Sequence, residues 1–336
     1  MEDMEIKNKN NKFWNKKKVL VTGGSGFVGF HLASSLAQNG AKVVVLDIKN
    51  LPKFSINKNS KNKLKFIKGS ISSETLVNKL FKKEKFDTVF HLAAEAIVSR
   101  ALNKPTKALD TNIRGTWLIL EASRLHKVKE VVVASSDKAY GIHQNLPYKE
   151  DYPLWGKYPY ECSKSCTDLI AQMYFETFDL PVVIARCGNI YGEGDMNGTR
   201  LIPDFLRTMF HQKEFIVRSN GKFLRDFIHV DDIVSAYMLL AENLEKKKLH
   251  GHAFNFAHNK PLSVLDVLNL FKKKTKSNIE INIANTAKFE IPDQYLDWTK
   301  AKKILNWKPQ VDHERGFINV AAWYNDFFKK GGKLEK

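Results

Sequence analysis

The sequence predicts an α/β fold in which a doubly wound parallel sheet is joined to a smaller, interleaved lobe. Short runs of β-branched and aliphatic residues alternate with helix-compatible segments at the spacing typical of βαβ units. After Gly188 this alternation breaks, and glycine, proline and polar residues crowd positions 189–203. Such a change in the middle of the chain indicates that a second lobe begins there.

The first three elements are the most clearly marked. Residues 18–22 form a short apolar run that ends at two glycines, as a buried strand does before a turn. Residues 27–39 fit a helix that Gly40 ends. Residues 43–47 are a valine-rich run, which is typical of a strand covered on both faces of a parallel sheet.

The alternation continues as far as residue 187. Further strands are expected at residues 64–67, 87–92, 131–135 and 181–186. Further helices are expected at residues 73–83, 108–125 and 160–178. Residues 227–240 again fit a strand that leads into a core-packed helix, so we expect the two lobes to interleave.

The composition excludes several classes of protein. The 336 residues carry a net charge of +18, yet only nine of the 54 basic residues are arginine. A nucleic-acid surface concentrates arginine and aromatic residues, so no nucleic-acid partner is expected. The sequence has no run of about 18 apolar residues, so no membrane span is expected. The three cysteines form no CxxC pair, so we expect no metal site and a cytoplasmic location.

A glycine-rich turn joins the first strand to the first helix. Gly23, Gly26 and Gly29 permit a tight turn, a close approach of the backbone to a pyrophosphate, and close helix–sheet packing. The N-terminus of the helix offers unpaired N–H groups to the phosphates. Asp47 ends the second strand, where its carboxylate can accept hydrogen bonds from a ribose and would repel a 2′-phosphate. The sequence therefore predicts a Rossmann-type dinucleotide site that takes NAD.

These elements set the expected domains. Residues 1–17 are expected to be a disordered basic leader, and residues 326–336 a tail. Residues 18–187 are expected to form the dinucleotide-binding domain, which also receives about residues 226–245. Residues 188–325 are expected to form mainly a substrate-binding lobe.

A second group of chemically competent residues lies near the middle of the chain. Tyr160 and Lys164 are four residues apart, which places them on one face of a helix. A nearby ammonium and the positive ring of the cofactor favour the phenolate form, so the pKa of Tyr160 is expected to fall towards working pH. Ser136, Asp137 and Lys138 follow the preceding strand, whose carboxyl end faces the dinucleotide crevice. We therefore expect a hydroxyl, a carboxyl and an amine to converge beside the tyrosine.

Six motifs follow one another along the chain: TGGSGFVG, HLAAE, SSDKAYG, PYECSK, RCGNIYGEGD and LRDFIHVDD. In this order they resemble the extended short-chain dehydrogenase/reductase family, the NAD-dependent epimerases and dehydratases. The match runs from about residue 18 to residue 309. Within the family the chain is most similar to the nucleotide-sugar 4,6-dehydratases, and among these to the CDP-glucose enzymes.

The resemblance implies a role for each matching residue. The catalytic residues would be Ser136, Asp137, Lys138, Tyr160 and Lys164, with Tyr160 as the base on the sugar 4-hydroxyl. The cofactor-binding residues would be Gly23, Gly26, Phe27, Val28, Gly29, Asp47, Ala93, Tyr160 and Lys164. The residues that bind a nucleotide-diphosphate sugar would be Glu95, Asn112, Asn189, Arg200 and Arg225.

Two positions depart from the pattern of many relatives. In dTDP-glucose 4,6-dehydratases a glutamate follows the aspartate and removes the C5 proton, whereas Lys138 stands there in this chain, as in the CDP-glucose enzymes. A lysine serves as a base only if burial or a neighbouring ammonium lowers its pKa. The sequence leaves open whether Lys138 or another group takes that proton. Ser70 replaces an aspartate that contacts adenine in many relatives.

The resemblance implies conversion of a nucleotide-diphosphate hexose to its 4-keto-6-deoxy form, through transient oxidation at C4 by bound NAD. A 4-epimerase of the UDP-glucose/galactose type and a 5,6-dehydratase stay open as alternatives, as does, more distantly, a non-catalytic NAD-sensing protein. Asp137 and Lys138 favour a dehydratase over an epimerase, because epimerases carry small or hydroxyl residues at these positions. Tyr160 and Lys164 disfavour a sensor, because such proteins usually lose one of the two.

A homodimer is the expected assembly. In relatives, two helices of each copy pair into a four-helix interface, and the corresponding segments here are residues 106–125 and 162–178. Their apolar faces could instead merely cover the sheet, so the sequence does not decide between the two.

Overall fold

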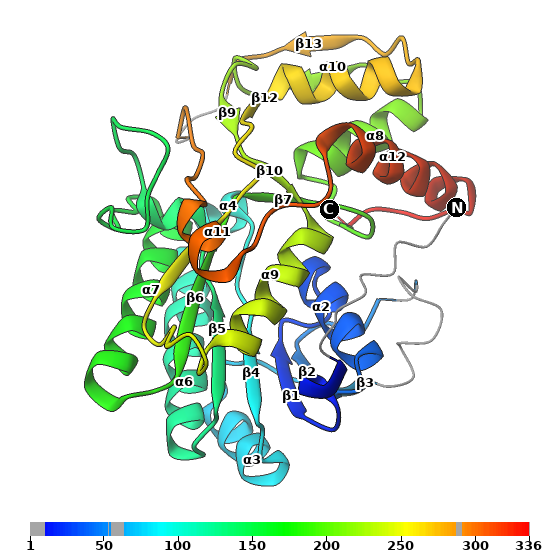
Figure 1. Ribbon diagram of the computed structural model, residues 1–336. Coiled ribbons are helices and arrows are strands. Elements are labelled where there is room, and N and C mark those ends of the chain that lie inside the picture. Colours follow the sequence, from blue (N-terminus) through cyan, green and yellow to red (C-terminus); the bar gives the residue numbers. More distant parts are fainter. Residues whose placement is uncertain (1–10, 53, 55–63, 287–290, 336) are drawn as a thin grey trace.

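A parallel sheet of seven strands lies at the centre of the molecule (Figure 1). The computed structural model describes residues 11–52, 54, 64–286 and 291–335. The strand order is β11-β6-β5-β4-β1-β2-β3, with all neighbours parallel. The strand bounds are β1 Lys18–Thr22, β2 Lys42–Asp47, β3 Leu64–Lys68, β4 Thr88–His91, β5 Glu130–Ala134, β6 Val182–Cys187 and β11 Ala253–Phe256. The order reverses beside β1, which confirms the predicted doubly wound α/β fold.

Successive residues of a strand face opposite layers of helices. In β1, Val19 and Val21 pack in one apolar cluster and Leu20 in the other, and all three are fully buried. Helices α1, α2, α9 and α11 cover the first face, and α3, α6 and α7 cover the second. The helix bounds are α1 Asn11–Trp14, α2 Phe27–Gln38, α3 Glu74–Glu84, α6 Gly115–Leu125, α7 Pro159–Phe178, α9 Val230–Asn243 and α11 Thr299–Leu305. In the described part of the chain, no helix combines the length and apolar character needed to cross a membrane.

The smaller lobe lies beyond the carboxyl ends of the sheet strands (Figure 1). Its short strands pair as β7–β10, β9–β12 and β8–β13. The strand bounds are β7 Asn189–Tyr191, β8 Phe215–Val217, β9 Leu224–Arg225, β10 Phe227–His229, β12 Leu262–Ser263 and β13 Ile281–Ile283. The helix bounds are α8 Leu201–Phe210, α10 Val264–Thr275 and α12 His313–Lys329. These helices share an aromatic-rich core of their own, which includes Phe205, Phe271 and Phe317.

The helix expected at residues 108–125 is divided into three parts. The three parts are α5 (Pro105–Leu109), a π-helical turn η2 (Asp110–Arg114) and α6. A short helix, α4 (Val98–Asn103), precedes them. Inside η2, the Asn112 side chain bonds to the backbone of Glu95, and the Thr116 hydroxyl donates to the Asn112 carbonyl at 2.5 Å. Because these bonds require a particular orientation of Asn112, the wider turn is a tertiary effect that hydrophobic periodicity does not reveal.

The C-terminal half of the chain contributes more to the sheet than the sequence indicates. Helix α9 packs on the sheet within the segment expected to return there, residues 226–245. The structure adds β11, which pairs with β6 and lies beyond that segment, in the region assigned mainly to the substrate lobe. The AFNF run at 253–256 is only four residues long, which is too short for periodicity to mark it as a strand of the central sheet.

The expected leader is wrong for residues 11–17. Trp14, on α1, is fully buried, and its indole Nε1 donates to Glu242 Oε1 at 2.5 Å. Its ring lies 5.9 Å from that of Phe90. The expectation followed from the polarity of this stretch, but burial of one aromatic side chain is enough to fix it against the core. Residues 1–10 lie outside the described residues.

The expected tail at 326–336 also needs correction. Helix α12 continues to Lys329, and Phe328 is buried in the smaller lobe. Beyond it, the Glu335 N–H donates to the Met196 carbonyl at 2.7 Å, and its carbonyl accepts from Gly198 N–H at 2.9 Å. These segments are far apart in sequence, so their pairing leaves no local signal. Lys336 lies outside the described residues.

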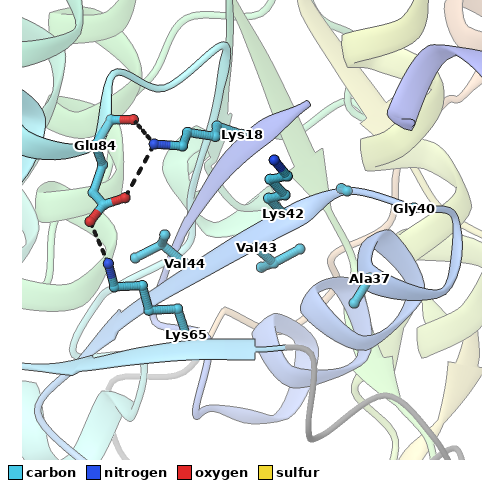
Figure 2. Close-up of a pocket in the computed structure, with 9 residues that line it drawn as sticks. Lys18, Ala37, Gly40, Lys42, Val43, Val44, Lys65 and Glu84 are labelled. Carbon is cyan, nitrogen blue, oxygen red and sulfur yellow. Dashed lines mark hydrogen bonds and ion pairs between the residues drawn. The ribbon is translucent and has the colours of Figure 1, made fainter. Parts of the chain in front are cut away.

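The amino-terminal edge of the sheet, opposite the smaller lobe, is closed by charged pairs. Lys18 Nζ donates to the Glu84 carbonyl at 2.8 Å, and Lys65 Nζ to Glu84 Oε1 at 2.5 Å (Figure 2). Hydrogen bonding from Lys65 lowers the pKa of Glu84. These side chains border a cavity of about 460 Å³ that is also lined by Val43 and Val44. The charges of this edge are thus largely engaged with one another.

Candidate active site

The turn between β1 and α2 is packed so closely that side chains are excluded from it. Gly23 has φ +71°, and an added Cβ would lie 2.7 Å from the Ala93 nitrogen. A Cβ at Gly29 would lie 2.2 Å from the Gly23 carbonyl oxygen. At Gly26 the Gly23 carbonyl oxygen, at 3.2 Å, is the one described atom that an added Cβ would approach within 4 Å. The turn is therefore rigid, while its Gly26 side stays open for a pyrophosphate at the N-terminus of α2.

The carboxylate of Asp47 is fixed at this turn. Its Oδ2 accepts from Ser25 N–H at 3.0 Å, and its Oδ1 accepts from Lys49 N–H at 2.9 Å. Phe27 and Val28 form the first turn of α2 and are both partly buried. The position of Asp47 at the end of β2 suits contact with a ribose hydroxyl, as the sequence predicts.

The catalytic candidates after β5 are held together by their own hydrogen bonds. They begin the 3-10 turn η3 (Asp137–Tyr140), which Ser136 caps by accepting from Lys138 N–H at 3.2 Å. Asp137 Oδ1 accepts from Ser136 Oγ at 2.9 Å and from Lys138 Nζ at 3.2 Å. Asp137 is 1% exposed, and its Oδ2 has no hydrogen-bond partner among the described residues. A buried carboxylate oxygen left without a partner is unusual and points to a ligand.

Tyr160 and Lys164 come from the first two turns of α7, and both are buried. Lys164 Nζ donates to the Ala134 carbonyl, at the end of β5, at 2.7 Å. Burial lowers the pKa of Lys164 to about 8. The helix thereby brings the tyrosine to the same strand end that carries Ser136.

The fall expected for the Tyr160 pKa counted the positive ring of the cofactor, and the protein alone shows the opposite shift. Burial, and then the charge of Asp137, raise the pKa of Tyr160 to about 12, against the opposing effects of the Ser136 hydroxyl and Arg200. The sequence argument counted the Lys164 ammonium and the cofactor ring but not the loss of water around the phenol. Lowering this pKa requires a further positive charge in the site.

The sugar-nucleotide candidates divide into two groups. Asn189 lies beside η3 and its capping residue Ser136, together called the catalytic turn below. Its Oδ1 accepts from Lys138 Nζ at 3.1 Å. Arg200 is close enough to Tyr160 to affect its pKa, and its guanidinium is oriented by Asp195 Oδ2 at 2.9 Å. Arg225, on β9 of the smaller lobe, forms the second group, because its guanidinium is engaged with the protein backbone. Its guanidinium donates to backbone carbonyls at positions 224, 291 and 292, at 2.8, 2.6 and 2.6 Å.

Asn112 and Glu95 form a structural joint beside the site. Asn112 Oδ1 accepts from Glu95 N–H at 2.7 Å, and its Nδ2 donates to the Glu95 carbonyl at 3.2 Å and to Ser163 Oγ at 2.9 Å. Asn112 is 1% exposed. The hydrogen bonds of the Asn112 amide therefore connect the loop at Glu95 to α7, and Asn112 acts as a positioning residue.

Two acidic residues near the site were not singled out in the sequence. Asp195 orients Arg200, as described above, and its motif, RCGNIYGEGD, was the signal that could have revealed it. Asp226 is fully buried and accepts from Leu296 N–H at 2.7 Å. Burial, together with the charge of Asp137, raises the pKa of Asp226 to about 7.

Comparison with known proteins gives an independent view of this site. A model of the "NAD dependent epimerase/dehydratase family" matches residues 19–257. Human dTDP-D-glucose 4,6-dehydratase is 28% identical over 95% of this chain and 93% of its own length. The crystal structure of UDP-glucose 4-epimerase from Thermotoga maritima with UDP-glucose is also 28% identical, with a TM-score of 0.84, and covers 93% of this chain and 99% of its own.

A second solved structure bears on the cofactor. The dTDP-glucose 4,6-dehydratase of Streptomyces venezuelae, with NAD bound, is 26% identical, has a TM-score of 0.83 and covers 92% of this chain and 97% of its own. The family description and this structure both name NAD, which confirms the predicted cofactor. The glycine turn and Asp47 fit it, because Gly26 leaves room for its pyrophosphate at the N-terminus of α2 and Asp47 ends β2, where a carboxylate can accept from its ribose.

Proposed function

Because the chain belongs to the NAD-dependent epimerase/dehydratase family, we propose that it is a nucleotide-sugar 4,6-dehydratase. The reaction converts a nucleotide-diphosphate hexose to the 4-keto-6-deoxy sugar nucleotide and one water. Bound NAD would supply the chemistry that takes hydrogen from the sugar and gives it back within one cycle. The observation that carries the proposal is the Asp137–Lys138 pair beside Tyr160, with one buried carboxylate oxygen unpartnered among the described residues.

Tyr160 acts as the base on the sugar 4-hydroxyl. Its phenol is buried and therefore a weak acid in the protein alone, so it becomes reactive only when positive charge enters the site. The oxidised cofactor ring carries such a charge. Lys164 adds to it and is fixed by the Ala134 carbonyl at 2.7 Å. Ser136 lies beside the phenol and lowers its pKa.

Asp137 and Lys138 carry the proton that leaves C5. Oxidation at C4 acidifies the neighbouring C5–H, and Lys138, or a group near it, removes that proton. Lys138 Nζ lies 3.2 Å from Asp137 Oδ1, so the proton can pass to the carboxylate. Asp137 then protonates the departing 6-hydroxyl, so the proton taken at C5 leaves in the water. When hydrogen returns to C6, the proton that Tyr160 took from the 4-hydroxyl is delivered to C5, which completes the 4-keto-6-deoxy sugar. An epimerase has no use for such a pair, because it expels no group.

The substrate we favour is a CDP-hexose. The support is Lys138, which stands where the dTDP-glucose enzymes carry a glutamate and matches the CDP-glucose enzymes. Arg200, oriented by Asp195, is the residue we assign to the diphosphate, because a guanidinium suits a phosphate geometrically. Arg225 and Asn112 are assigned supporting roles, because their polar groups already bond to protein atoms.

A 4-epimerase is the second candidate. The observation in its favour is the Thermotoga epimerase, which matches the human dehydratase in identity to this chain. A 5,6-dehydratase would use the same residues as the 4,6-dehydratase and differs only in where the hydrogen returns.

One experiment separates these activities. Purified protein with NAD is incubated with CDP-, UDP-, GDP- and dTDP-hexoses, and the products are examined by mass spectrometry and NMR. Loss of one water with a ketone at C4 and a methyl group at C6 is the expected result. An unchanged mass with inverted C4 stereochemistry would identify an epimerase, and an exocyclic alkene a 5,6-dehydratase.

We also propose that the protein is a homodimer through α6 and α7. Their outer faces leave large apolar side chains exposed, among them Trp117 at 41%, Leu169 at 52% and Met173 at 43%. The two helices pack against each other, so these side chains can form one surface for a second copy. Light scattering after size exclusion should give twice the monomer mass, and a monomer at all concentrations would refute the dimer.

A further inference from the structure

Asp168 on α7 and Arg186 on β6 form a buried ion pair that takes no part in the proposed chemistry. Asp168 is 0% exposed and Arg186 is 2% exposed. Arg186 Nε donates to Asp168 Oδ2 at 2.8 Å, and Arg186 Nη2 donates to Oδ1 at 2.9 Å. Two parallel bonds of this kind fix both the distance and the relative orientation of the elements that carry them.

The rest of the guanidinium reaches the catalytic turn. Arg186 Nη1 donates to the Tyr140 hydroxyl at 2.8 Å and to the Glu150 carbonyl at 3.0 Å. Tyr140 in turn donates to Asn255 Oδ1, on β11, at 2.7 Å. Every one of these groups is therefore engaged, as a buried polar network requires.

Arg186 stays charged despite its burial. Burial alone would lower the pKa of Arg186, but hydrogen bonding and charge attraction from Asp168 raise it. Buried pairs of this kind add little net stability, because removing two charges from water offsets their attraction. Their retention calls for another explanation, and geometric specification is one that the connections of this pair support.

Those connections join α7 and η3, the two elements that carry the catalytic residues, to the strand β6. Asp168 lies on α7 one turn beyond Lys164, Arg186 lies on β6, and Tyr140 ends the η3 turn that Asp137 begins. In sequence, the 136–138 group and α7 are separated by a loop of about twenty residues. The guanidinium spans this separation directly.

We propose that Arg186, through its paired bonds to Asp168 and its bond to Tyr140, is the positioning residue that fixes α7 against the catalytic turn. It thereby sets the distance between Tyr160 and Ser136. The inference rests on the proposed function for its kinetic consequence but not for its structural one. Misplacing reacting groups by about 1 Å costs on the order of 100-fold in rate.

The decisive variant is the double substitution Arg186→Met with Asp168→Leu. Either change alone leaves an unpaired buried charge or carboxylate and endangers folding, whereas removing both leaves apolar side chains of similar size. We expect a melting temperature near that of the wild type and unchanged NAD affinity. We expect kcat to fall by about 10- to 100-fold while KM changes less than about twofold.

The matched control removes a second ion pair from the same sheet. Lys17 and Glu130 are 2.7 Å apart at the amino-terminal edge, far from the crevice. Lys17→Met with Glu130→Leu should leave kcat unchanged. If the Arg186/Asp168 double variant does not fold, the Arg186→Lys variant is tested instead. Lysine keeps the positive charge but cannot form the two parallel hydrogen bonds of a guanidinium. A fall in kcat at unchanged KM supports the proposal, and wild-type kcat overturns it.

A crystal structure of the variant makes the test independent of the reaction. We expect α7 to shift so that the Tyr160–Ser136 distance changes by more than about 0.5 Å, the tolerance of a working site. An unmoved α7 refutes the inference, whatever the activity. If the wild-type protein turns over none of the sugar nucleotides, the proposed function is wrong, and the crystal structure still decides the role of Arg186.

Discussion

The amino-terminal and carboxyl-terminal ends of the strands, called here the two edges of the central sheet, differ in how their charged residues are paired. At the amino-terminal edge, Lys18 and Lys65 bond to Glu84 (Figure 2). At the carboxyl edge, Lys164 is buried with a pKa lowered to about 8, and one oxygen of Asp137 has no hydrogen-bond partner among the described residues. At the amino-terminal edge these charged groups pair with one another, whereas at the carboxyl edge buried polar groups can form further hydrogen bonds with a ligand.

The comparison explains why chemistry is confined to one side of a symmetrical-looking sheet. The lysines of the amino edge are partly exposed, with side chains 40% and 52% accessible, so water screens their charges. At the carboxyl edge the smaller lobe and α7 exclude water, and each charge acts at close to full strength on its neighbours. Substitutions at the two edges should therefore differ greatly in effect.

The largest effect is expected for Tyr160→Phe. Loss of the phenol removes the base on the sugar 4-hydroxyl, and we expect turnover to fall by about 1,000-fold with NAD affinity little changed. The measurement is product formation by mass spectrometry over time. Tyr174→Phe, the same chemical change farther along α7, is the control and should keep near-normal turnover. Comparable losses in both variants would contradict the role of Tyr160.

The next effect is expected for Asp137→Asn. The amide cannot protonate the 6-hydroxyl, so overall turnover should fall by about 100-fold or more. Oxidation at C4 should persist, and reduced cofactor should accumulate on the enzyme, which its near-ultraviolet absorbance reports. Undiminished release of the dehydrated product would show that another group is the acid.

A smaller effect is expected for Asp47→Ala. Hydrogen bonds to a charged group contribute about 1.5–3 kcal/mol, so NAD should bind about 10- to 100-fold more weakly. NADP affinity should change much less, because the aspartate repels its 2′-phosphate. Titration calorimetry with both cofactors provides the comparison. Equal losses for the two would reject Asp47 as the ribose contact.

The smallest effect is expected at the amino edge, for Glu84→Gln. The lysines that it pairs with are half exposed and regain water, so the free energy of unfolding should fall by at most about 1 kcal/mol. Turnover and NAD affinity should stay within about twofold of the wild type. Urea unfolding measures the free energy of unfolding, and steady-state kinetics measure turnover. A large fall in turnover would contradict the expected difference between substitutions at the two edges.

Most of the central sheet was predictable because each strand and helix leaves a local pattern. The runs at 18–22 and 43–47 coincide with β1 and β2 to within a residue. The π-helical turn at η2, the strand β11 and the burial of Trp14 were not predictable in this way. Each depends on partners far along the chain, such as Glu242 for Trp14.

The site shows the same division. The spacing of Tyr160 and Lys164 predicted that both lie on one face of α7, and the glycine pattern predicted the close-packed turn between β1 and α2. The sequence could not show that burial raises the pKa of Tyr160, because desolvation depends on what surrounds the phenol. Nor could it show that the amide of Asn112 is already engaged with Glu95 and Ser163.

The sequence by itself determined the layered α/β architecture and the glycine-rich turn, and it supplied the residues that we propose as reactive groups. These follow from residue type and short-range spacing, which act through backbone conformation and local amphipathicity. Tertiary structure alone decided which charges are paired, which are buried and how α7 meets the catalytic turn, as the Arg186–Asp168 pair illustrates. The physical reason is that solvation and hydrogen-bond geometry are properties of the assembled surroundings of a residue.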